Sequence, residues 1–209
     1  SFTGAYTVVK IRHIANFRSS DANSWVTVLD LYAQQVPPPA VIIPQGTPSI
    51  APIGSKAAAA AANANMQAFL SMVRQLESGN RYNVIYGGET FPSYAAHPNI
   101  KVPFVNPATG KNDVSTAAGA YQMIFTTWLK AAGRAALTDF TPASQDRAAI
   151  ELFALHGATD TVMRGDFDSA LKIMSVEWAS LPYSTAQQHP AGYNAALALY
   201  RGFGGQVQV

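Results

Sequence analysis

The segment MVRQLESGNRYNVIYGGETF, residues 72–91, contains the change of pattern on which the predicted fold depends. Apolar residues at helical spacing run from Met66 to Leu76 and predict an amphipathic helix that ends near Glu77. Small and polar residues follow at positions 78–80, and Tyr82–Tyr86 then has the composition of a strand. The sequence therefore predicts a helix and a short β element joined by a tight turn, with an acidic residue at the junction.

That acidic residue is Glu77, and the C-terminus of a helix is where a negative charge is least favourable. Glu77 lies four residues after Val73 and seven after Leu70, so we expect its side chain to share the apolar face. Burial raises the pKa of a carboxyl group, and a carboxylic acid protonated near neutral pH can cleave a glycosidic bond by general-acid catalysis. The alternative is an ordinary carboxylate at a helix end, neutralised by Arg74 or Arg81.

Composition excludes several classes of protein. The 209 residues are 48% hydrophobic and 12% charged, which suits one domain with an appendage or two small domains. The net charge of +2 is too small to indicate nucleic acid or a membrane surface as a partner. The absence of cysteine excludes disulfides, thiolate metal sites and cysteine nucleophiles, and the four histidines lack ligand spacing. We therefore expect no metal and no cofactor.

The first part of the chain has a different organisation. Within residues 1–35, YTVVKIRHI and SWVTVLDLY alternate with period two around the polar NFRSSDAN, which predicts a β-hairpin. An isolated hairpin is marginal in water, so we expect it to close a larger β domain or to pair with another chain. Residues 36–62 are predicted to be a Pro- and Ala-rich linker. Its KAAAAAANAN run is either flexible spacer or, as we favour, the start of a helix capped near Ser55 or Asn63.

Residues 63–205 are predicted to form a mainly helical α+β domain. Thr141 is a suitable N-cap, Pro142 suits a first helical position, and Gly157 suits a helix end. A further β segment is expected in IKVPFV, residues 100–105. The other expected helices are Ala120–Lys130, Pro142–His156, Asp168–Ser180 and Ala191–Arg201.

Two segments could form a groove for a sugar. Beside Glu77, the backbone at Ser78 is open, and Tyr82 and Tyr86 are spaced to form a wall. In STAAGAYQMIFTTW, residues 115–128, a glycine turn precedes an aromatic residue and an amide, which suit the apolar faces and hydroxyl rim of a sugar. The alternative for this second segment is a helix N-terminus whose Tyr121 lies in the core.

Taken together, five co-linear segments resemble the phage lambda lysozyme family of peptidoglycan lytic transglycosylases over about residues 66–203. These segments are FLSMVRQLESGNRYNVIYGGETFPSYAAHP, STAAGAYQMIFTTW, DFTPASQDRAAIELFALHGA, VMRGDF and VEWASLP. The resemblance implies a lysozyme-like fold, with Glu77 of LESG as the catalytic acid. The residues expected to bind the glycan strand are Ser78, Tyr82, Tyr86, Glu89, Gly119, Tyr121, Gln122 and Trp178.

The resemblance implies a mechanism with one acid. Glu77 would protonate the oxygen that links N-acetylmuramic acid to N-acetylglucosamine and then accept the proton of the muramyl 6-hydroxyl as a 1,6-anhydro ring closes. Asn83 stands where the family commonly has Asp, which also favours a single acid. A two-carboxylate hydrolase would need a partner, and Glu89 and Asp113 are the plausible ones nearby in the sequence. Glu177, beside Trp178, is expected to be structural.

The N-terminal region bears on the biological role. Its hairpin pattern has a weaker resemblance to the closing hairpin of phage tail or baseplate hub proteins. We therefore expect a virion-associated enzyme that contacts other tail or baseplate proteins and opens the wall in the host periplasm during infection. The alternatives are an inactive, glycan-binding structural part of a tail, and a free lysis enzyme, an endolysin.

Overall fold

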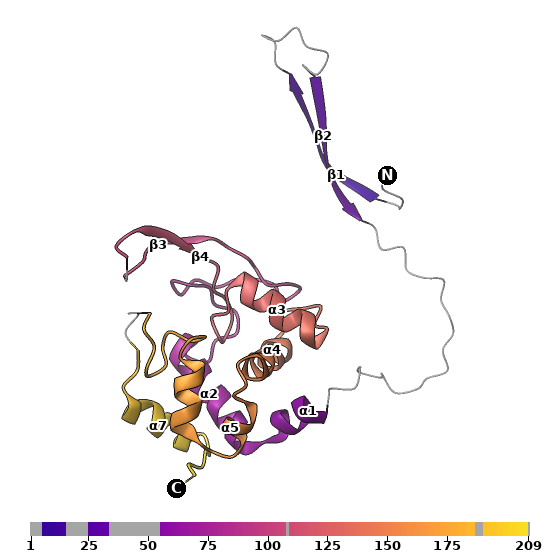
Figure 1. Cartoon of the computed structure of the whole chain (residues 1–209). Helices are drawn as coiled ribbons and strands as arrows, with labels where there is room; N and C mark the ends of the chain where they lie inside the picture. Colours follow the sequence, from indigo (N-terminus) through magenta and orange to yellow (C-terminus); the bar gives the residue numbers. More distant parts are fainter. Residues whose placement is uncertain (1–5, 16–24, 34–54, 108, 187–189, 209) are drawn as a thin grey trace, which may run out of the picture. The chain divides into compact units, whose positions relative to one another are not determined.

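The computed structural model describes residues 6–15, 25–33, 55–107, 109–186 and 190–208, in two units that comprise residues 1–49 and 50–209. In the first unit, β1 (Tyr6–Ala15) and β2 (Trp25–Ala33) form an antiparallel pair (Figure 1). This confirms the hairpin that the period-two pattern predicts. Of the linker predicted over residues 36–62, residues 36–54 lie outside the described residues, and residues 55–62 are helical.

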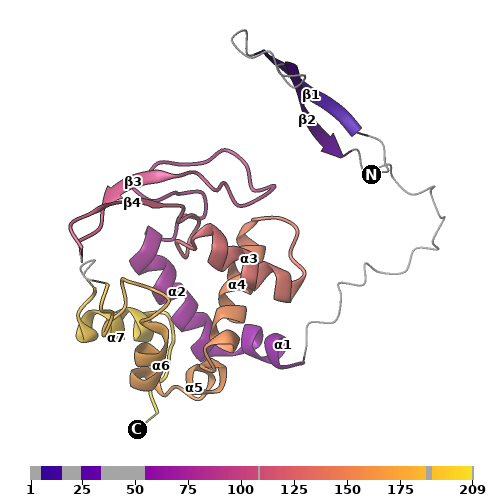
Figure 2. The ribbon, with the colours of Figure 1, turned by 45° about the horizontal axis from the view of Figure 1, so that its top comes forward.

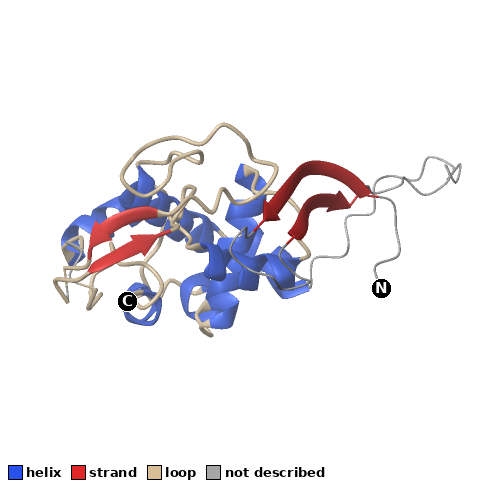
Figure 3. Cartoon of the chain, turned by 90° about the horizontal axis from the view of Figure 1, so that it is seen from above, coloured by secondary structure: helices blue, strands red, loops and turns tan. Residues whose placement is uncertain are grey.

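The second unit is mostly helical with one small antiparallel sheet, so the predicted α+β class is confirmed. The helix α2 runs through the middle of the other helices, and its C-terminal end lies toward the side that carries the sheet (Figures 1 and 2). Long loops connect these elements (Figure 3). The elements are α1 (Ser55–Ala62), α2 (Ala64–Ser78), β3 (Val102–Val105), β4 (Asn112–Ser115), α3 (Phe125–Ala135), α4 (Pro142–Leu155), α5 (Thr159–Met163), α6 (Phe167–Met174) and α7 (Tyr193–Gly202).

Local signals explain both ends of α2. The side chain of Asn63 accepts a hydrogen bond from the backbone N–H of Met66, which satisfies a donor at the first turn. At the other end Gly79 has φ of 63°, and its N–H and that of Asn80 donate to the last carbonyls of the helix. Met66, Phe69, Leu70 and Val73 of the apolar stripe are buried, as the periodicity predicts, and Leu76 is partly buried. The alanine run before Asn63 forms α1, so the helical interpretation of that run is confirmed.

Three predicted elements differ from those observed. The helix α3 begins at Phe125 rather than Ala120, because residues 119–123 form a turn in which Gln122 has φ of 44°. The helix α6 ends at Met174, and turns occupy most of the next ten residues. The strand predicted over Tyr82–Tyr86 is reduced to isolated bridges, one of which joins Ile85 to Ala118. Each departure lies beside the cavity described below.

Aromatic packing holds α2 in place. The ring of Phe69 lies 5.4 Å from that of Phe153 on α4, 6.0 Å from Phe167 on α6 and 6.2 Å from Tyr200 on α7. All four side chains are buried, and burial of such rings contributes both apolar area and edge-to-face contacts. Helices distant in sequence therefore determine where α2 lies in the unit.

Among the helices of the described ranges, none has the length and apolar character needed to span a bilayer.

Candidate active site

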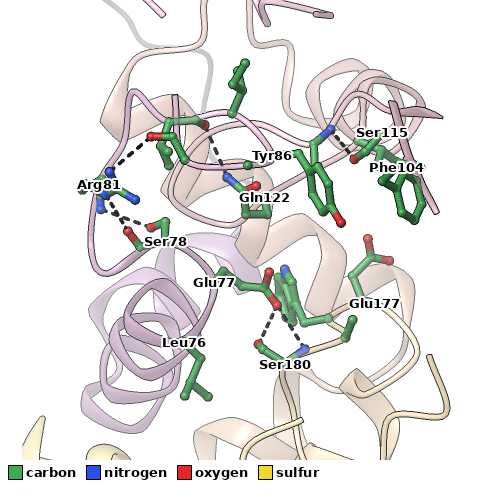
Figure 4. Close-up of a pocket in the computed structure, with 18 of the residues that line it drawn as sticks. Leu76, Glu77, Ser78, Arg81, Tyr86, Phe104, Ser115, Gln122, Glu177 and Ser180 are labelled. Atoms are coloured by element: carbon green, nitrogen blue, oxygen red, sulfur yellow. Dashed lines mark hydrogen bonds between the residues drawn. The ribbon is translucent and has the colours of Figure 1, made fainter. Parts of the chain in front are cut away.

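A cavity of about 490 Å³ lies at the C-terminal end of α2 (Figure 4). It is bounded on one side by residues 84–88 and by Phe104 of β3, and on the other by residues 177–180. Glu77 and Ser78 come from the last turn of α2, and Gln122 comes from the turn before α3. The cavity is therefore built where the helical part of the unit meets its sheet and loops.

Glu77 is half-buried in this cavity, and its carboxylate is bound by one residue of a distant segment. The Ser180 hydroxyl donates to Oε1 at 2.5 Å, and the Ser180 backbone N–H donates to the same oxygen at 3.4 Å. Removal from water raises the pKa of Glu77, and the two hydrogen bonds from Ser180 lower it by less. The net result is a carboxyl group whose pKa lies above its usual range.

Neither neighbouring arginine neutralises Glu77. Arg74 Nη1 lies 3.1 Å from Asp146 Oδ1, and Arg81 Nε donates to the carbonyl of Ser78 at 3.0 Å. Within the described part of the chain, Glu77 forms no ion pair at 4 Å or less. The sequence-based alternative of a helix-end carboxylate neutralised by these arginines is therefore wrong.

A hydrogen-bond network behind the cavity ties α2 to α4. Asp146 Oδ1 accepts from the Tyr82 hydroxyl at 2.8 Å, the Tyr121 hydroxyl at 2.7 Å and Arg74 Nη1 at 3.1 Å. Burial raises the pKa of both tyrosines, so their hydroxyls remain donors. Tyr121 is 1% exposed and does not line this cavity; its ring packs in the core, where Asp146 and Arg74 satisfy its hydroxyl.

The turn before α3 is held by a buried amide. Gln145 is 1% exposed; its Oε1 accepts from Ala120 N at 2.8 Å, and its Nε2 donates to the carbonyls of Tyr82 and Phe140. Gly119, with φ of 78°, packs directly against this amide, and a side chain there would overlap it. The turn thus places Gln122 on the cavity wall, whereas Gly119 itself lies behind it.

The predicted binding residues are therefore divided by the structure. Ser78, Tyr86, Gln122 and Trp178 line the cavity together with Glu77. Trp178 is 3% exposed and donates its indole N–H to the carbonyl of Tyr121, so it forms a floor. The predicted residues absent from the lining are Tyr82, Glu89, Gly119 and Tyr121.

Aromatic rings and an unexpected carboxylate form the rest of the wall. The ring of Tyr86 lies 5.2 Å from that of Phe104, and Figure 4 shows Tyr86, Glu77 and Glu177 around one open space. Glu177 Oε2 lies 2.9 Å from His156 Nε2, so one end of this carboxylate is held by a partner outside the cavity. Glu177 lines the cavity, although the sequence indicated only a structural residue.

Sequence reasoning did not assign Arg81, Glu177 and Ser180 to the site, although all three line the cavity. The second carboxylates it considered, Glu89 and Asp113, do not line the cavity. No periodicity marks residues 177 and 180, because they reach the cavity in turns that follow α6. The sequence feature that could have identified them is the WASLP segment, which contains Ser180 and directly follows Glu177.

The remaining polar groups do not form a metal site. In the residues that the structure describes, no three His, Asp or Glu side chains are grouped so as to hold an ion. His97 is buried against Phe140, with Nε2 2.9 Å from the Met123 carbonyl and Nδ1 accepting from Asn99 N. Burial lowers the pKa of His97, so it serves as a neutral link between two loops.

Comparisons with known proteins agree with this geometry. A family model described as Endolysin matches residues 67–207. The endolysin of Escherichia phage lambda is 34% identical over 70% of this chain and 95% of its own length, and that of Escherichia phage P2 is 31% identical over 68% and 93%. The structure of bacteriophage lambda lysozyme complexed with a chitohexasaccharide matches with a TM-score of 0.63 at 34% identity, over 70% of this chain and 97% of that one.

Proposed function

The chain belongs to the endolysin family and is a lysozyme-like phage enzyme of cell-wall lysis, and we propose that it cleaves the β-1,4 bond between N-acetylmuramic acid and N-acetylglucosamine in peptidoglycan, with formation of a 1,6-anhydro ring. One observation carries the proposal: Glu77 lies in the cavity with a raised pKa and without a cationic partner among the described residues. A carboxyl group in this state is protonated over a wider pH range, as a general acid requires.

The cavity suits a glycan strand. A related lysozyme has been solved with a chitohexasaccharide, a chain of β-1,4-linked N-acetylhexosamines. Here the half-buried ring of Tyr86 offers an apolar face, while Gln122 and Ser78 contribute polar groups to the lining of the same cavity. Apolar faces with a few polar groups are the usual lining of a small-molecule site.

The proposed reaction uses Glu77 twice. Its proton passes to the glycosidic oxygen as the bond from that oxygen to C1 of the muramyl residue breaks. The oxygen of the muramyl 6-hydroxyl then bonds to C1, and its proton passes to the Glu77 carboxylate. The acid is restored, no water is consumed, and the hydroxyl of Ser180 stabilises the carboxylate between the two steps.

A hydrolytic alternative has one observation in its favour. Two-carboxylate glycosidases need a second carboxylate facing the scissile bond, and Glu177 lines the same cavity as Glu77. However, one oxygen of Glu177 is engaged by His156 at 2.9 Å. We therefore favour the single-acid reaction, and the product distinguishes the two.

Digestion of purified peptidoglycan is expected to release disaccharide peptides that are lighter by one water than hydrolysis products. Mass spectrometry before and after borohydride reduction checks this, because a 1,6-anhydro end cannot be reduced whereas a free reducing end gains two hydrogens. A hydrolytic muramidase, digested in parallel, provides the reducible reference. Reducible muramic acid as the main product would reject the transglycosylase reaction and would direct attention to Glu177.

Ser180→Ala is expected to move the alkaline limb of the pH profile of kcat/KM to higher pH. The hydroxyl of Ser180 stabilises the ionised form of Glu77 and so lowers its pKa. Its removal raises that pKa, and because Glu77 must be protonated to donate, activity persists to higher pH. Ser175→Ala removes a hydroxyl that is bonded to the Lys172 carbonyl away from the cavity, and this control should leave the profile in place.

The biological role we propose is peptidoglycan degradation in the host periplasm. The two phage relatives named above are endolysins that align along nearly their whole length, and the endolysin family model matches residues 67–207, which lie in the helical unit. This supports a lysis enzyme more than the virion-associated enzyme suggested by the N-terminal hairpin. Immunodetection in purified particles separates these roles: association with tails or baseplates would restore the virion-associated role.

A further inference from the structure

Arg81 is an exposed cation at the rim of the cavity, in the turn that follows α2 (Figure 4). Its Nε donates to the carbonyl of Ser78 at 3.0 Å, and its Nη1 lies 3.5 Å from the carbonyl of Gly88. Its backbone N–H donates to the Ser78 hydroxyl at 3.1 Å. The guanidinium is therefore held in position by neutral groups from α2 and from residues 84–88, and its Nη2 donates to no group among the residues that the structure describes.

No carboxylate within the described ranges lies within 4 Å of Arg81. The other charged residues of the cavity wall are Glu77, which is proposed to be protonated when it acts, and Glu177, which His156 holds. Arg81 is thus the cation on the described wall that remains available to an anionic group of a ligand. A planar guanidinium with free N–H donors is well matched to a carboxylate, which it can bind through two parallel hydrogen bonds.

The two sugars of peptidoglycan differ in charge. Each muramyl residue carries a lactyl group, whose carboxyl is either free or joined by an amide to a peptide that itself carries carboxylates. N-acetylglucosamine has no such group, and chitin oligosaccharides are therefore neutral. A cation at the rim of a glycan cavity can distinguish the two polymers by charge.

We propose that Arg81 binds a carboxylate carried by the muramyl residue and so makes the enzyme select peptidoglycan over neutral chitin-type glycans. This inference rests on the proposed function. Arg81 contributes to specificity and has no part in proton transfer. Because the contact lies at a solvent-exposed rim, salt screens it, and its contribution falls as ionic strength rises.

The test compares Arg81→Gln with Arg201→Gln, which removes the same charge from an exposed position on α7 outside the cavity. The substrates are glycan strands freed of their peptides, which carry lactyl carboxylates, and strands with intact peptides; chitohexaose serves as a neutral competitive inhibitor. At low salt, Arg81→Gln is expected to raise KM for a muramyl substrate about fivefold, with a much smaller change in kcat. The inhibition constant of chitohexaose should change less than twofold.

Further measurements separate binding from folding. The KM of the wild type should rise with salt, and that of Arg81→Gln should be nearly independent of salt. Arg81→Lys should recover part of the loss because it retains the charge. Thermal unfolding should decrease only slightly for Arg81→Gln, through loss of the hydrogen bonds to Ser78 and Gly88, and should be unchanged for Arg201→Gln. If Arg81→Gln raises KM for peptide-free strands, Arg81 binds the lactyl carboxylate. If KM rises only for strands with intact peptides, Arg81 binds a carboxylate of the peptide.

Two results would overturn the inference: an unchanged KM for both muramyl substrates, or equal weakening of the neutral and the anionic ligands. Arg201→Gln effects as large as those of Arg81→Gln would also reject it, because net charge would then be the cause. A wild-type protein that cleaves no muramyl glycan would instead refute the proposed function.

Discussion

Glu77→Gln is expected to abolish cleavage of peptidoglycan, with a loss of at least about a thousandfold in kcat, while the domain remains folded. Glutamine has nearly the same shape as glutamic acid, so packing at the end of α2 is conserved. It cannot donate a proton to the glycosidic oxygen or accept one from the muramyl 6-hydroxyl, and in a single-acid reaction both steps are lost. The release of soluble fragments from purified peptidoglycan measures the effect.

Stability gives an independent check on this variant. Burial raises the pKa of Glu77 in the folded state above its usual value of 4.5. The folded state therefore favours the protonated form, and this stability is present below pH 4.5 and is lost as the pH rises through the higher folded value. Glu77→Gln does not ionise, so its melting temperature relative to the wild type should increase across that pH range.

The matched control is Glu89→Gln, since Glu89 lies near Glu77 in the sequence but does not line the cavity. This variant should retain nearly full activity. Substantial cleavage by Glu77→Gln, or a loss in Glu89→Gln as large as that in Glu77→Gln, would remove Glu77 from the proposed role. Unfolding of Glu77→Gln at neutral pH would show that the carboxylate has a structural function instead.

Gly119→Ala is expected to produce the largest loss of stability, about 3 kcal/mol or more in the free energy of unfolding. A Cβ at this position would lie 2.2 Å from Gln145 Oε1 and 2.9 Å from the ring of Phe140, and φ of 78° is unfavourable for alanine. Gln145 is fully enclosed and forms three hydrogen bonds, so relief of the overlap breaks contacts with the turn or with α4. Chemical denaturation with a two-state fit measures the loss.

Gly157→Ala separates the steric overlap of a new Cβ from the conformational penalty of a positive φ. Gly157 has φ of 68°, but open space surrounds the position of its Cβ. This control therefore carries only the conformational penalty, about 1–2 kcal/mol. Equal destabilisation of the two variants would mean that the amide of Gln145 moves aside without loss, and that the turn before α3 is less tightly held than the structure indicates.

Short-range patterns in the sequence were sufficient for much of the fold. Apolar spacing predicted α2 and the inward direction of Glu77, and a Thr-Pro pair predicted the start of α4, where Thr141 accepts a hydrogen bond from Ser144 N. Alternation predicted β1 and β2. These features depend on residues within a turn or two of one another, whose geometry is the same in any protein.

The turn at residues 119–122 was not predictable in the same way. Its sequence is compatible with a helix start, and a helix from Ala120 was expected. It forms a turn because Gln145, some 25 residues later, binds Ala120 N, and because the hydroxyl of Tyr121 reaches Asp146. The same contacts place Tyr121 in the core rather than in the groove.

The sequence by itself determined that an acid ends the apolar face of a central helix, because helical periodicity is local. Only the tertiary structure decided that Ser180, 103 residues away, binds this acid, and that Arg81 and Glu177 share its cavity. The raised pKa of Glu77 depends on which distant segments exclude water from it. The specificity proposed for Arg81 depends on the absence of a carboxylate within 4 Å of its guanidinium among the described residues. Both are properties of packing between distant parts of the chain, and no local pattern encodes them.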